Sequence, residues 1–378
     1  MTTAPAAPAE LRTDPRAPLP MKDRIVFVDI GRGSAALLVV YTHINMVWMY
    51  RDHGISTAVT DAVSTAFANP LHLADVGLLA VPFFFLASGF VITPMALRQG
   101  YASFAVNRLF RIYPLLALAI LLTAGALLVG LNPIATDQQG PVTPITVLTN
   151  ISLLNYIIYP QVVLLSVAWT LIVEMIFYLM VMLLLPVFRR APWLAVAIQL
   201  TLIEVVMVTR AQFGPSYSLF AFNMLLTTLP IIGQIIWLGF TRRISGLLAG
   251  IYIGIAWWLY VWAKELEVGN IEPGYPTAVA VVIMLFLLGL LAEPYLRQRQ
   301  VWTVLSERTY SIYLMHGITS FIVLDALYGL VPLWIAVVIA VAATAATAEI
   351  TYRFVEVPSR SLGRSLARSL RQRARAER

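Results

Sequence analysis

Long apolar runs recur along the chain and are separated by short polar segments. A helix that crosses a bilayer needs about 20 consecutive, mostly apolar residues. The pattern predicts about ten such helices, at residues 28–50, 72–97, 112–131, 163–187, 192–210, 217–239, 244–263, 276–293, 309–329 and 332–352. We therefore expect an all-α polytopic membrane protein.

Two segments break this pattern. The run at 145–160 is short, carries polar residues and ends at Pro160, so it favours an interfacial or re-entrant piece. Residues 1–23 are rich in Ala and Pro and lack an apolar run, which predicts a disordered cytoplasmic lead. The expected organisation is this lead, a transmembrane domain over 24–358 and a basic cytoplasmic tail over 359–378.

The basic residues indicate an orientation for these helices. With the N-terminus inside, 23 of the 26 Lys and Arg residues fall on the inner side of the predicted spans, and only Arg51, Arg210 and Lys264 fall outside. Positive residues concentrate on the cytoplasmic side of membrane proteins. The distribution predicts an even number of spans, two cytoplasmic termini and insertion into the plasma (cytoplasmic) membrane.

Composition narrows the possible chemistry. The chain is 60% hydrophobic and 12% charged, unlike a soluble domain. It has no cysteine, which excludes disulfides, thiolate nucleophiles and cysteine metal sites, and we expect no metal. The net charge of +7 comes largely from inner segments and the tail. We interpret the tail as a solvated helix at the anionic inner leaflet, and expect no nucleic-acid partner.

Ionisable residues inside apolar spans are costly and usually face the bundle interior or a wet cavity. Candidate functional positions are therefore Asp29, Arg32, His43, Asp75, Glu174, Glu204, His316 and Glu349. Arg32 and His43 are eleven residues apart, which puts them on one helix face about 16 Å apart along the axis. Asp29, three residues before Arg32, is expected to pair with it. The alternative for His43 is a purely structural hydrogen bond to a neighbouring helix.

Three further patterns support a polar site. Arg108 and Arg111 are three residues apart, the spacing of a phosphate clamp, although positive-inside charge explains most such pairs. Glu174 shares a face with Thr170 and Tyr178, and His43 is its expected partner; a structural polar latch is the alternative. The ninth span begins with Tyr310, Tyr313 and His316. These residues are either site residues or interfacial anchors.

These pieces, in this order, resemble the acyltransferase-3 family of integral membrane acyltransferases. The resemblance covers roughly residues 24 to 360. Its motifs are Asp29, Arg32, Gly33 and His43; Phe83–Ile92 with Ser88; Arg108 and Arg111 with Tyr113-Pro114; Trp169-Thr170-Leu171 with Glu174; Tyr310–Leu314 with His316; and Tyr352–Glu356 with Pro358. The late block departs from the family pattern, because His316 lies between Met315 and Gly317. No folded soluble domain is expected at either end, as in the stand-alone form without a fused esterase-like domain.

The resemblance implies transfer of an acyl group, commonly acetyl from acetyl-CoA, to a hydroxyl of a sugar, cell-surface glycan or natural product. Acyl-CoA is then a co-substrate and not a permanently bound cofactor. His43, oriented by Glu174, is the expected general base, and the expected phosphate ligands are Arg32, Arg108 and Arg111. A covalent acyl-histidine relay is the less favoured variant. Ser88 is expected to be a packing residue more than a nucleophile.

Two other classes remain open at this stage. A proton-coupled transporter or flippase of a polar or glycan-like solute also carries His and Glu in its spans. The second class is a scaffold that binds lipid or a partner and catalyses no reaction. A succinyl or longer acyl donor is compatible with the same motifs.

Overall fold

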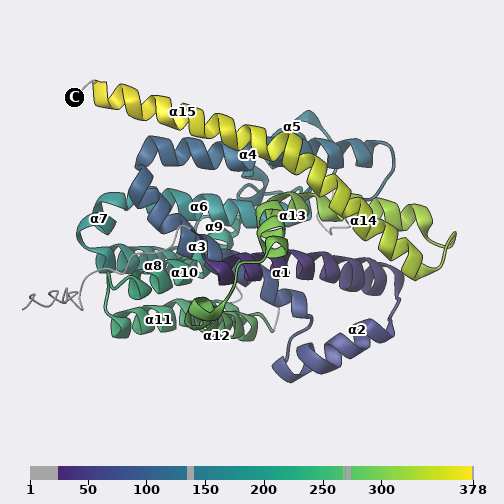
Figure 1. Cartoon of the computed structure of the whole chain (residues 1–378), viewed down its shortest axis with the longest axis horizontal. Coiled ribbons are helices and arrows are strands. Elements are labelled where there is room, and N and C mark those ends of the chain that lie inside the picture. The colour runs from purple at the N-terminus through teal and green to yellow at the C-terminus, as the bar shows by residue number, and fades with distance from the viewer. Residues whose placement is uncertain (1–23, 134–139, 267–268, 270–273, 377–378) are drawn as a thin grey trace, which may run out of the picture.

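The computed structural model describes residues 24–133, 140–266, 269 and 274–376, and these residues contain helices and no strand. Most long helices run along one common direction (Figure 1). The helical elements are α1 Val26–Thr42, η1 His43–Asp52, α2 Ala58–Val63, η2 Ser64–Ala68, η3 Asn69–Leu71, η4 Val76–Leu79, α3 Ala80–Gln99, α4 Tyr101–Leu128, α5 Pro144–Ile151, η5 Leu154–Tyr156, η6 Ser166–Ala168, α6 Trp169–Leu183, α7 Leu185–Arg190, α8 Pro192–Thr209, α9 Pro215–Leu226, α10 Thr228–Phe240, α11 Gly246–Glu265, α12 Tyr275–Ala292, η7 Glu293–Tyr295, α13 Gln300–Leu327, α14 Leu333–Thr351, η8 Tyr352–Glu356 and α15 Val357–Ala376. The predicted lead at 1–23 lies outside the described residues.

The all-α polytopic prediction is confirmed. Within the described part of the chain, nine helices are long and apolar enough to cross a membrane. They match the second to tenth predicted spans. The first predicted span is also helical, from Val26 to Asp52, as α1 followed directly by the π-helical segment η1. It is not among the nine, and it is the span that carries Asp29, Arg32 and His43.

Two helices begin earlier in the chain than the predicted spans and include charged residues that the predictions left out. Helix α4 begins at Tyr101 and not at 112, and α13 begins at Gln300 and not at 309. Hydropathy ends a predicted span at its first cluster of charges, whereas the helix continues because those charges are accommodated in the fold: Arg108 and Arg111 on α4 line a cavity, and Arg308 on α13 pairs with Glu349. The segment 145–160 forms only the short α5 and η5, in agreement with a piece that does not span.

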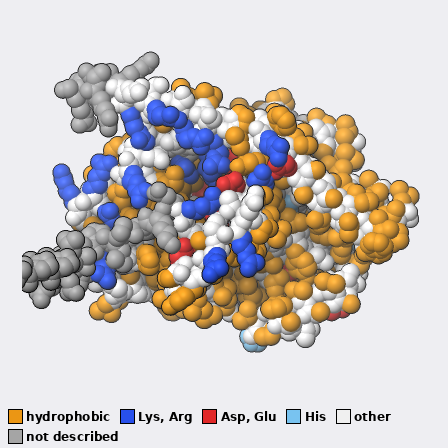
Figure 2. Space-filling model, in the orientation of Figure 1, with side chains coloured by type: hydrophobic (Ala, Val, Ile, Leu, Met, Phe, Trp, Pro, Cys, Tyr) orange, Lys and Arg blue, Asp and Glu red, His pale blue; other side chains and the backbone are white. Residues whose placement is uncertain are grey.

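The basic tail packs against the bundle. Helix α15 lies along α4 (Figure 1). The Ser103 hydroxyl donates to the Ala367 carbonyl (3.2 Å) and accepts from Arg371 Nε (2.8 Å). The prediction of a solvated helix is therefore corrected for one face of α15. On the face shown in Figure 2, basic side chains gather over one half of the molecule and hydrophobic side chains over the other.

Two glycines bring α3 and α10 into backbone contact. A Cβ at Gly89 would lie 1.7 Å from the Pro230 carbonyl oxygen, and a Cβ at Gly233 would lie 2.0 Å from the Leu86 carbonyl oxygen. Small residues at such positions let membrane helices approach closely. The contact fixes the rotation of α3, and with it the direction of Ser88 next to Gly89.

Helices α1 and α13 pack side by side and run in the same direction. The contacts between them follow the same order along both helices. Gly33 faces Trp302 and Leu305, and farther along His43 lies against His316. Farther on, the Trp48 indole nitrogen donates to Asp325 Oδ1 (2.6 Å). Residues at three depths of α1 and η1 are thus matched with residues at three depths of α13.

We predict that Gly89→Ala destabilises the protein by about 1–3 kcal/mol, because the added methyl group overlaps the α10 backbone. Thermal unfolding in detergent measures this change. Gly125→Ala on α4 is the matched control, since a Cβ there meets no atom within 4 Å and Ala favours a helix. Equal unfolding temperatures for the two variants would contradict the proposed close contact.

Candidate functional site

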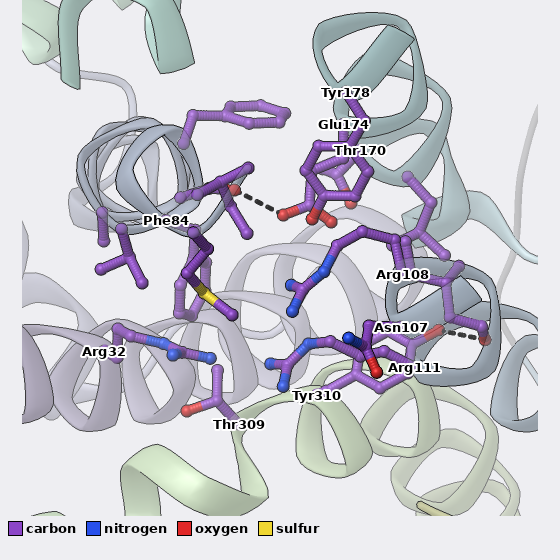
Figure 3. Close-up of a pocket in the computed structure, with 18 of the residues that line it drawn as sticks. Arg32, Phe84, Asn107, Arg108, Arg111, Thr170, Glu174, Tyr178, Thr309 and Tyr310 are labelled. Atoms are coloured by element: carbon purple, nitrogen blue, oxygen red, sulfur yellow. Dashed lines mark hydrogen bonds between the residues drawn. The ribbon is translucent and has the colours of Figure 1, made fainter. Parts of the chain in front are cut away.

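A cavity of about 380 Å³ opens between α1, α3, α4, α6, α13 and α15 (Figure 3). We call it the arginine cavity. Its lining on α3 extends from Val81 to Gln99, a distance of about 27 Å at 1.5 Å per residue. The site is therefore long and narrow. Phe84, Thr170 and Tyr313 lie toward its Val81 end, and Asn107 lies toward its Gln99 end.

The lining is strongly basic. Five arginines contribute to it, and Glu174 is the single carboxylate among the described lining residues; the arginines are Arg32, Arg108, Arg111, Arg360 and Arg364. In Figure 3, Arg32 on α1 and Arg108 and Arg111 on α4 point into the same space from opposite sides. The predicted cluster of three arginines is therefore brought together. Such a surplus of guanidinium groups suits a polyanion, which they bind through paired donors.

Arg108 has a buried hydrogen-bond donor without a partner in the described structure. Its side chain is buried, and its Nε has no hydrogen-bond partner among the described residues. The guanidinium lies 5.8 Å from the Phe104 ring centre and 5.9 Å from the Tyr178 ring centre. A buried donor without a partner is costly, so this position favours an anionic ligand.

Asp29 does not pair with Arg32, contrary to the sequence prediction. Its Oδ2 accepts from Arg24 Nε and from Gln298 Nε2 (3.0 Å). Residues three apart on a helix are neighbours, but a closer partner on another segment can take the carboxylate. With Asp29 engaged, Arg32 forms no ion pair or hydrogen bond with any residue that the structure describes, and its charge is directed into the cavity.

Glu174 also has a different partner from the predicted one. The Ser88 hydroxyl donates to Glu174 Oε1 at 2.6 Å (Figure 3). Thr170 and Tyr178 line the cavity beside Glu174, which confirms their common face. Among the described residues, no hydrogen bond joins Glu174 to His43. The prediction that Glu174 orients His43 is therefore wrong.

His43 instead lies against a second histidine. The His43 and His316 rings are 4.7 Å apart at 72°. His43 Nδ1 is 2.9 Å from the Val39 carbonyl, and His316 Nδ1 is 2.7 Å from the Tyr313 carbonyl. A carbonyl only accepts, so each Nδ1 carries a proton and each neutral ring keeps its lone pair on Nε2. The buried His316 Nε2 has no partner among the described residues.

Tyr313 separates the histidines from the arginine cavity. Its ring lines the cavity and lies 6.0 Å from the His316 ring. Its hydroxyl donates to the Val167 carbonyl (3.0 Å) and accepts from Thr170 (3.1 Å). His43 is not among the described residues that line the cavity, so the predicted arginine cluster and the predicted base occupy adjoining spaces.

Two of the aromatic candidates have packing partners. Tyr310 lines the cavity and donates to the Ile112 carbonyl at 2.7 Å, which ties α13 to α4. The Trp169 ring packs 6.1 Å from the Phe85 ring and does not line the cavity in the described structure. Trp169 therefore supports the wall that carries Thr170.

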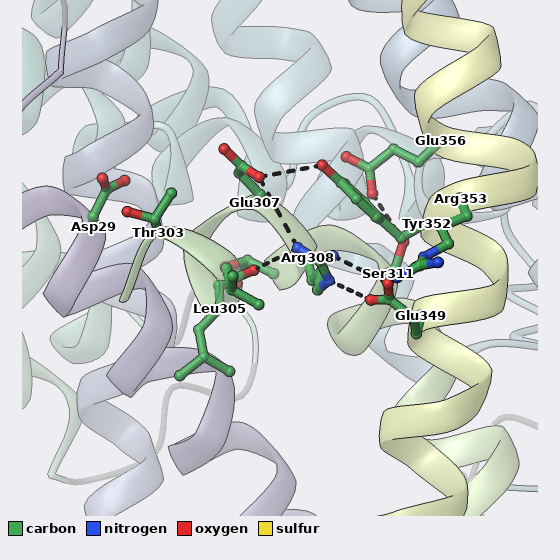
Figure 4. Close-up of polar contacts among 12 residues, drawn as sticks. Asp29, Thr303, Leu305, Glu307, Arg308, Ser311, Glu349, Tyr352, Arg353 and Glu356 are labelled. Atoms are coloured by element: carbon green, nitrogen blue, oxygen red, sulfur yellow. Dashed lines mark hydrogen bonds and ion pairs between the residues drawn. The ribbon is translucent and has the colours of Figure 1, made fainter. Parts of the chain in front are cut away.

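Sequence reasoning missed the contribution of α15 to this site. Arg360 and Arg364 line the cavity, and Arg360 Nη1 lies 3.3 Å from Glu356 Oε1. Glu356 is fully buried and accepts from Ser311 at 2.9 Å (Figure 4). The four-residue spacing of the two arginines on the tail was the available signal, because it places them on one helix face.

Other ionisable candidates have structural partners. Glu349 pairs with Arg308 and Arg353 (Figure 4), and Asp75 accepts from Thr42 and from the Gly77 amide. Glu204 is exposed on α8 and does not line the described cavity. These side chains hold helices together or face outward, so we do not place them in the site.

Comparison with known proteins identifies the family of the chain. The sequence model of a family described as "Acyltransferase domain" matches residues 25–352. A curated relative, "Nodulation protein 10" from Rhizobium leguminosarum bv. viciae, is 27% identical over 365 residues, which cover 89% of this chain and 94% of that protein. No solved structure matches the chain.

We predict that Glu356→Gln loosens α15, because Arg360 loses the charge that holds it in the cavity. Loss of a buried partner is strongly destabilising, and we expect amide exchange over 357–371 to accelerate about tenfold, equivalent to roughly 1.4 kcal/mol. Hydrogen–deuterium exchange with mass spectrometry measures this. Glu349→Gln is the matched control and should leave 357–371 unchanged; equal exchange in both variants would contradict the role of Glu356.

Proposed function

Because the chain belongs to the acyltransferase-3 family of membrane acyltransferases, we propose that it transfers an acyl group from acyl-CoA to a hydroxyl group. The proposed acyl group is acetyl, and the proposed acceptor is a sugar, a cell-surface glycan or a natural product. The proposed location is the plasma membrane, with the arginine cavity open to the cytoplasm. Acyl-CoA acts as a co-substrate.

The arginine cavity carries this proposal. Coenzyme A has a polyanionic nucleotide end, a long uncharged arm and a terminal thioester. The cavity lining combines both kinds of surface, with five arginines together with apolar and aromatic side chains such as Phe84 and Tyr313. The orphaned Arg108 Nε supplies a donor that a phosphate oxygen would satisfy. The cavity length of about 27 Å along α3 suits an extended arm.

Glu174 takes a different role from the one expected from sequence. It is the only carboxylate among the described lining residues, so it offsets part of the arginine charge when no ligand is present. It also fixes the Ser88 hydroxyl at 2.6 Å. We propose that Glu174 lowers the repulsion among the arginines and positions Ser88 along the path of the arm.

His43 is the proposed general base, and the Val39 carbonyl orients it. With its proton on Nδ1, the lone pair on Nε2 is free to accept the proton of an acceptor hydroxyl. The hydroxyl oxygen then bonds to the thioester carbonyl carbon, the carbon–sulfur bond breaks, and the leaving thiolate takes the proton from the imidazolium. The thioester reaches His43 past Tyr313, whose ring lies between the cavity and the histidines.

We predict that Arg108→Gln weakens acetyl-CoA binding by about ten- to a hundredfold, because a hydrogen bond to a charged group is worth roughly 1.5–3 kcal/mol. Isothermal titration of the protein in nanodiscs, with a non-cleavable acetyl-CoA analogue, measures the affinity. Arg98→Gln is the matched control, since Arg98 ends α3 outside the cavity lining. A wild-type protein that does not bind the analogue would favour the transporter alternative.

We predict that His43→Ala lowers acyl transfer by about 10²–10⁴-fold, the usual contribution of a general base, with little change in the affinity for acetyl-CoA. Ser88→Ala should reduce transfer by less than about tenfold, because Ser88 only positions the arm. Thiol release from acetyl-CoA in membrane vesicles of the native cell measures both rates. Loss of transfer in Ser88→Ala, together with an acyl adduct on Ser88 in the wild type, would replace the base mechanism with a serine relay.

A further inference from the structure

A second cavity lies at the other end of the α1–α13 pair. It measures about 580 Å³, within the range of small-molecule sites. We call it the aromatic cavity. It is lined by Trp48, Asp52, His53, Asn132, Phe321, Asp325 and Tyr328. Its residues come mainly from η1 and from the C-terminal end of α13, which also carry His43 and His316.

Three rings form one wall of the aromatic cavity. The His53 ring lies over the Trp48 ring at 4.0 Å and 30°, and the Tyr328 ring meets both at steep angles, 5.5 Å from Trp48 and 4.8 Å from His53. Trp48 is buried, whereas Tyr328 is 50% exposed. A ligand would therefore meet His53 and Tyr328, with Trp48 as their support.

Two carboxylates and an imidazole give the cavity several acceptors, beside the Asn132 amide and the Tyr328 hydroxyl, which can both donate and accept. Asp325 Oδ1 accepts a hydrogen bond from the Trp48 indole nitrogen (2.6 Å), and Asp52 Oδ1 accepts one from Arg51 Nε (2.8 Å). His53 Nδ1 donates to the Trp48 carbonyl (2.8 Å), so its Nε2 keeps a lone pair. Carboxylate oxygens and a bare imidazole nitrogen complement a ligand that donates several hydrogen bonds.

A polyhydroxylated ring has these properties. Its hydroxyls donate to carboxylates, and its C–H faces pack on aromatic rings. A small cation is the other ligand that rings and carboxylates attract. The ion pair between Asp52 and Arg51 already offsets part of the negative charge, which favours an uncharged polyol.

We propose that the aromatic cavity binds the hydroxyl acceptor, a polyhydroxylated ring such as a sugar. This inference rests on the proposed acyl transfer. Phe321 follows His316 by five residues on α13, which corresponds to about 7.5 Å along an α-helix, and Trp48 follows His43 by five residues on the π-helical η1. A hydroxyl directed inward from this cavity approaches the imidazoles from the side opposite the thioester. His43 then takes its proton, and the acyl carbon exchanges its bond to sulfur for a bond to that oxygen.

The test uses the full-length protein in nanodiscs and methyl β-D-glucoside as the probe, detected by saturation-transfer NMR. We expect binding to the wild type and at least tenfold weaker binding to Tyr328→Ala and Asp325→Asn. The matched controls are Tyr50→Ala and Asp61→Asn. Tyr50 is a comparably exposed tyrosine on η1, and neither residue lines the cavity. Unchanged binding in the cavity variants, or no binding to the wild type, would overturn the proposal.

The same samples are titrated with the acetyl-CoA analogue and with tetramethylammonium. Analogue binding without glucoside binding would overturn the acceptor site and leave the acyl-transfer proposal standing. Glucoside binding in the cavity without analogue binding would overturn the acyl-transfer proposal and the acceptor role together. Displacement of the glucoside by tetramethylammonium, with loss of both in Asp325→Asn, would overturn the polyol assignment in favour of a cation cage.

Discussion

The parallel packing of α1 and η1 along α13 is the constraint on which the candidate sites depend. Gly33 permits this packing, because a Cβ there would lie 3.1 Å from Leu305 and 3.2 Å from Trp302. At one end Arg24 contacts Glu307 at 3.1 Å, and at the other end Trp48 donates to Asp325. With both ends fixed, the buried His316 and the half-buried His43 meet in the middle.

The arginine cavity illustrates how membrane helices keep charge away from lipid. Isolated charges in a bilayer are costly, so α4 turns Arg108 and Arg111 inward, and α15 covers the same space with Arg360. Only some of these charges have partners. Arg360 is held by the buried Glu356, whereas Arg108 keeps an unpaired Nε. A bundle that gathers more guanidinium than carboxylate gains stability from an anion in the cavity, because binding to the folded state stabilises it.

Much of the fold was predictable from the sequence, and the pairing of its charged groups was not. Spans follow from apolar runs, because a bilayer imposes their length. Helical spacing also placed Thr170, Glu174 and Tyr178 on one face. Spacing does not decide between competing partners, however, and Asp29 is taken by Arg24 while Glu174 is taken by Ser88. These contacts, like those of α15 with α4, depend on tertiary packing between distant segments.

If an acyl group is transferred between the two cavities, they cannot form one open passage. A passage open from end to end would leak ions and admit water, and water would compete with an acceptor hydroxyl for the thioester. Tyr313 lies on one side of the histidines, and the buried Trp48 and Phe321 lie on the other. Side chains that exclude water from a site strengthen its electrostatic interactions and suppress hydrolysis. In the proposed reaction, both substrates would have to reach the imidazoles at once, one past Tyr313 and the other past Trp48. Productive transfer would therefore depend on simultaneous occupancy of the arginine and aromatic cavities, which protects the thioester until an acceptor is bound.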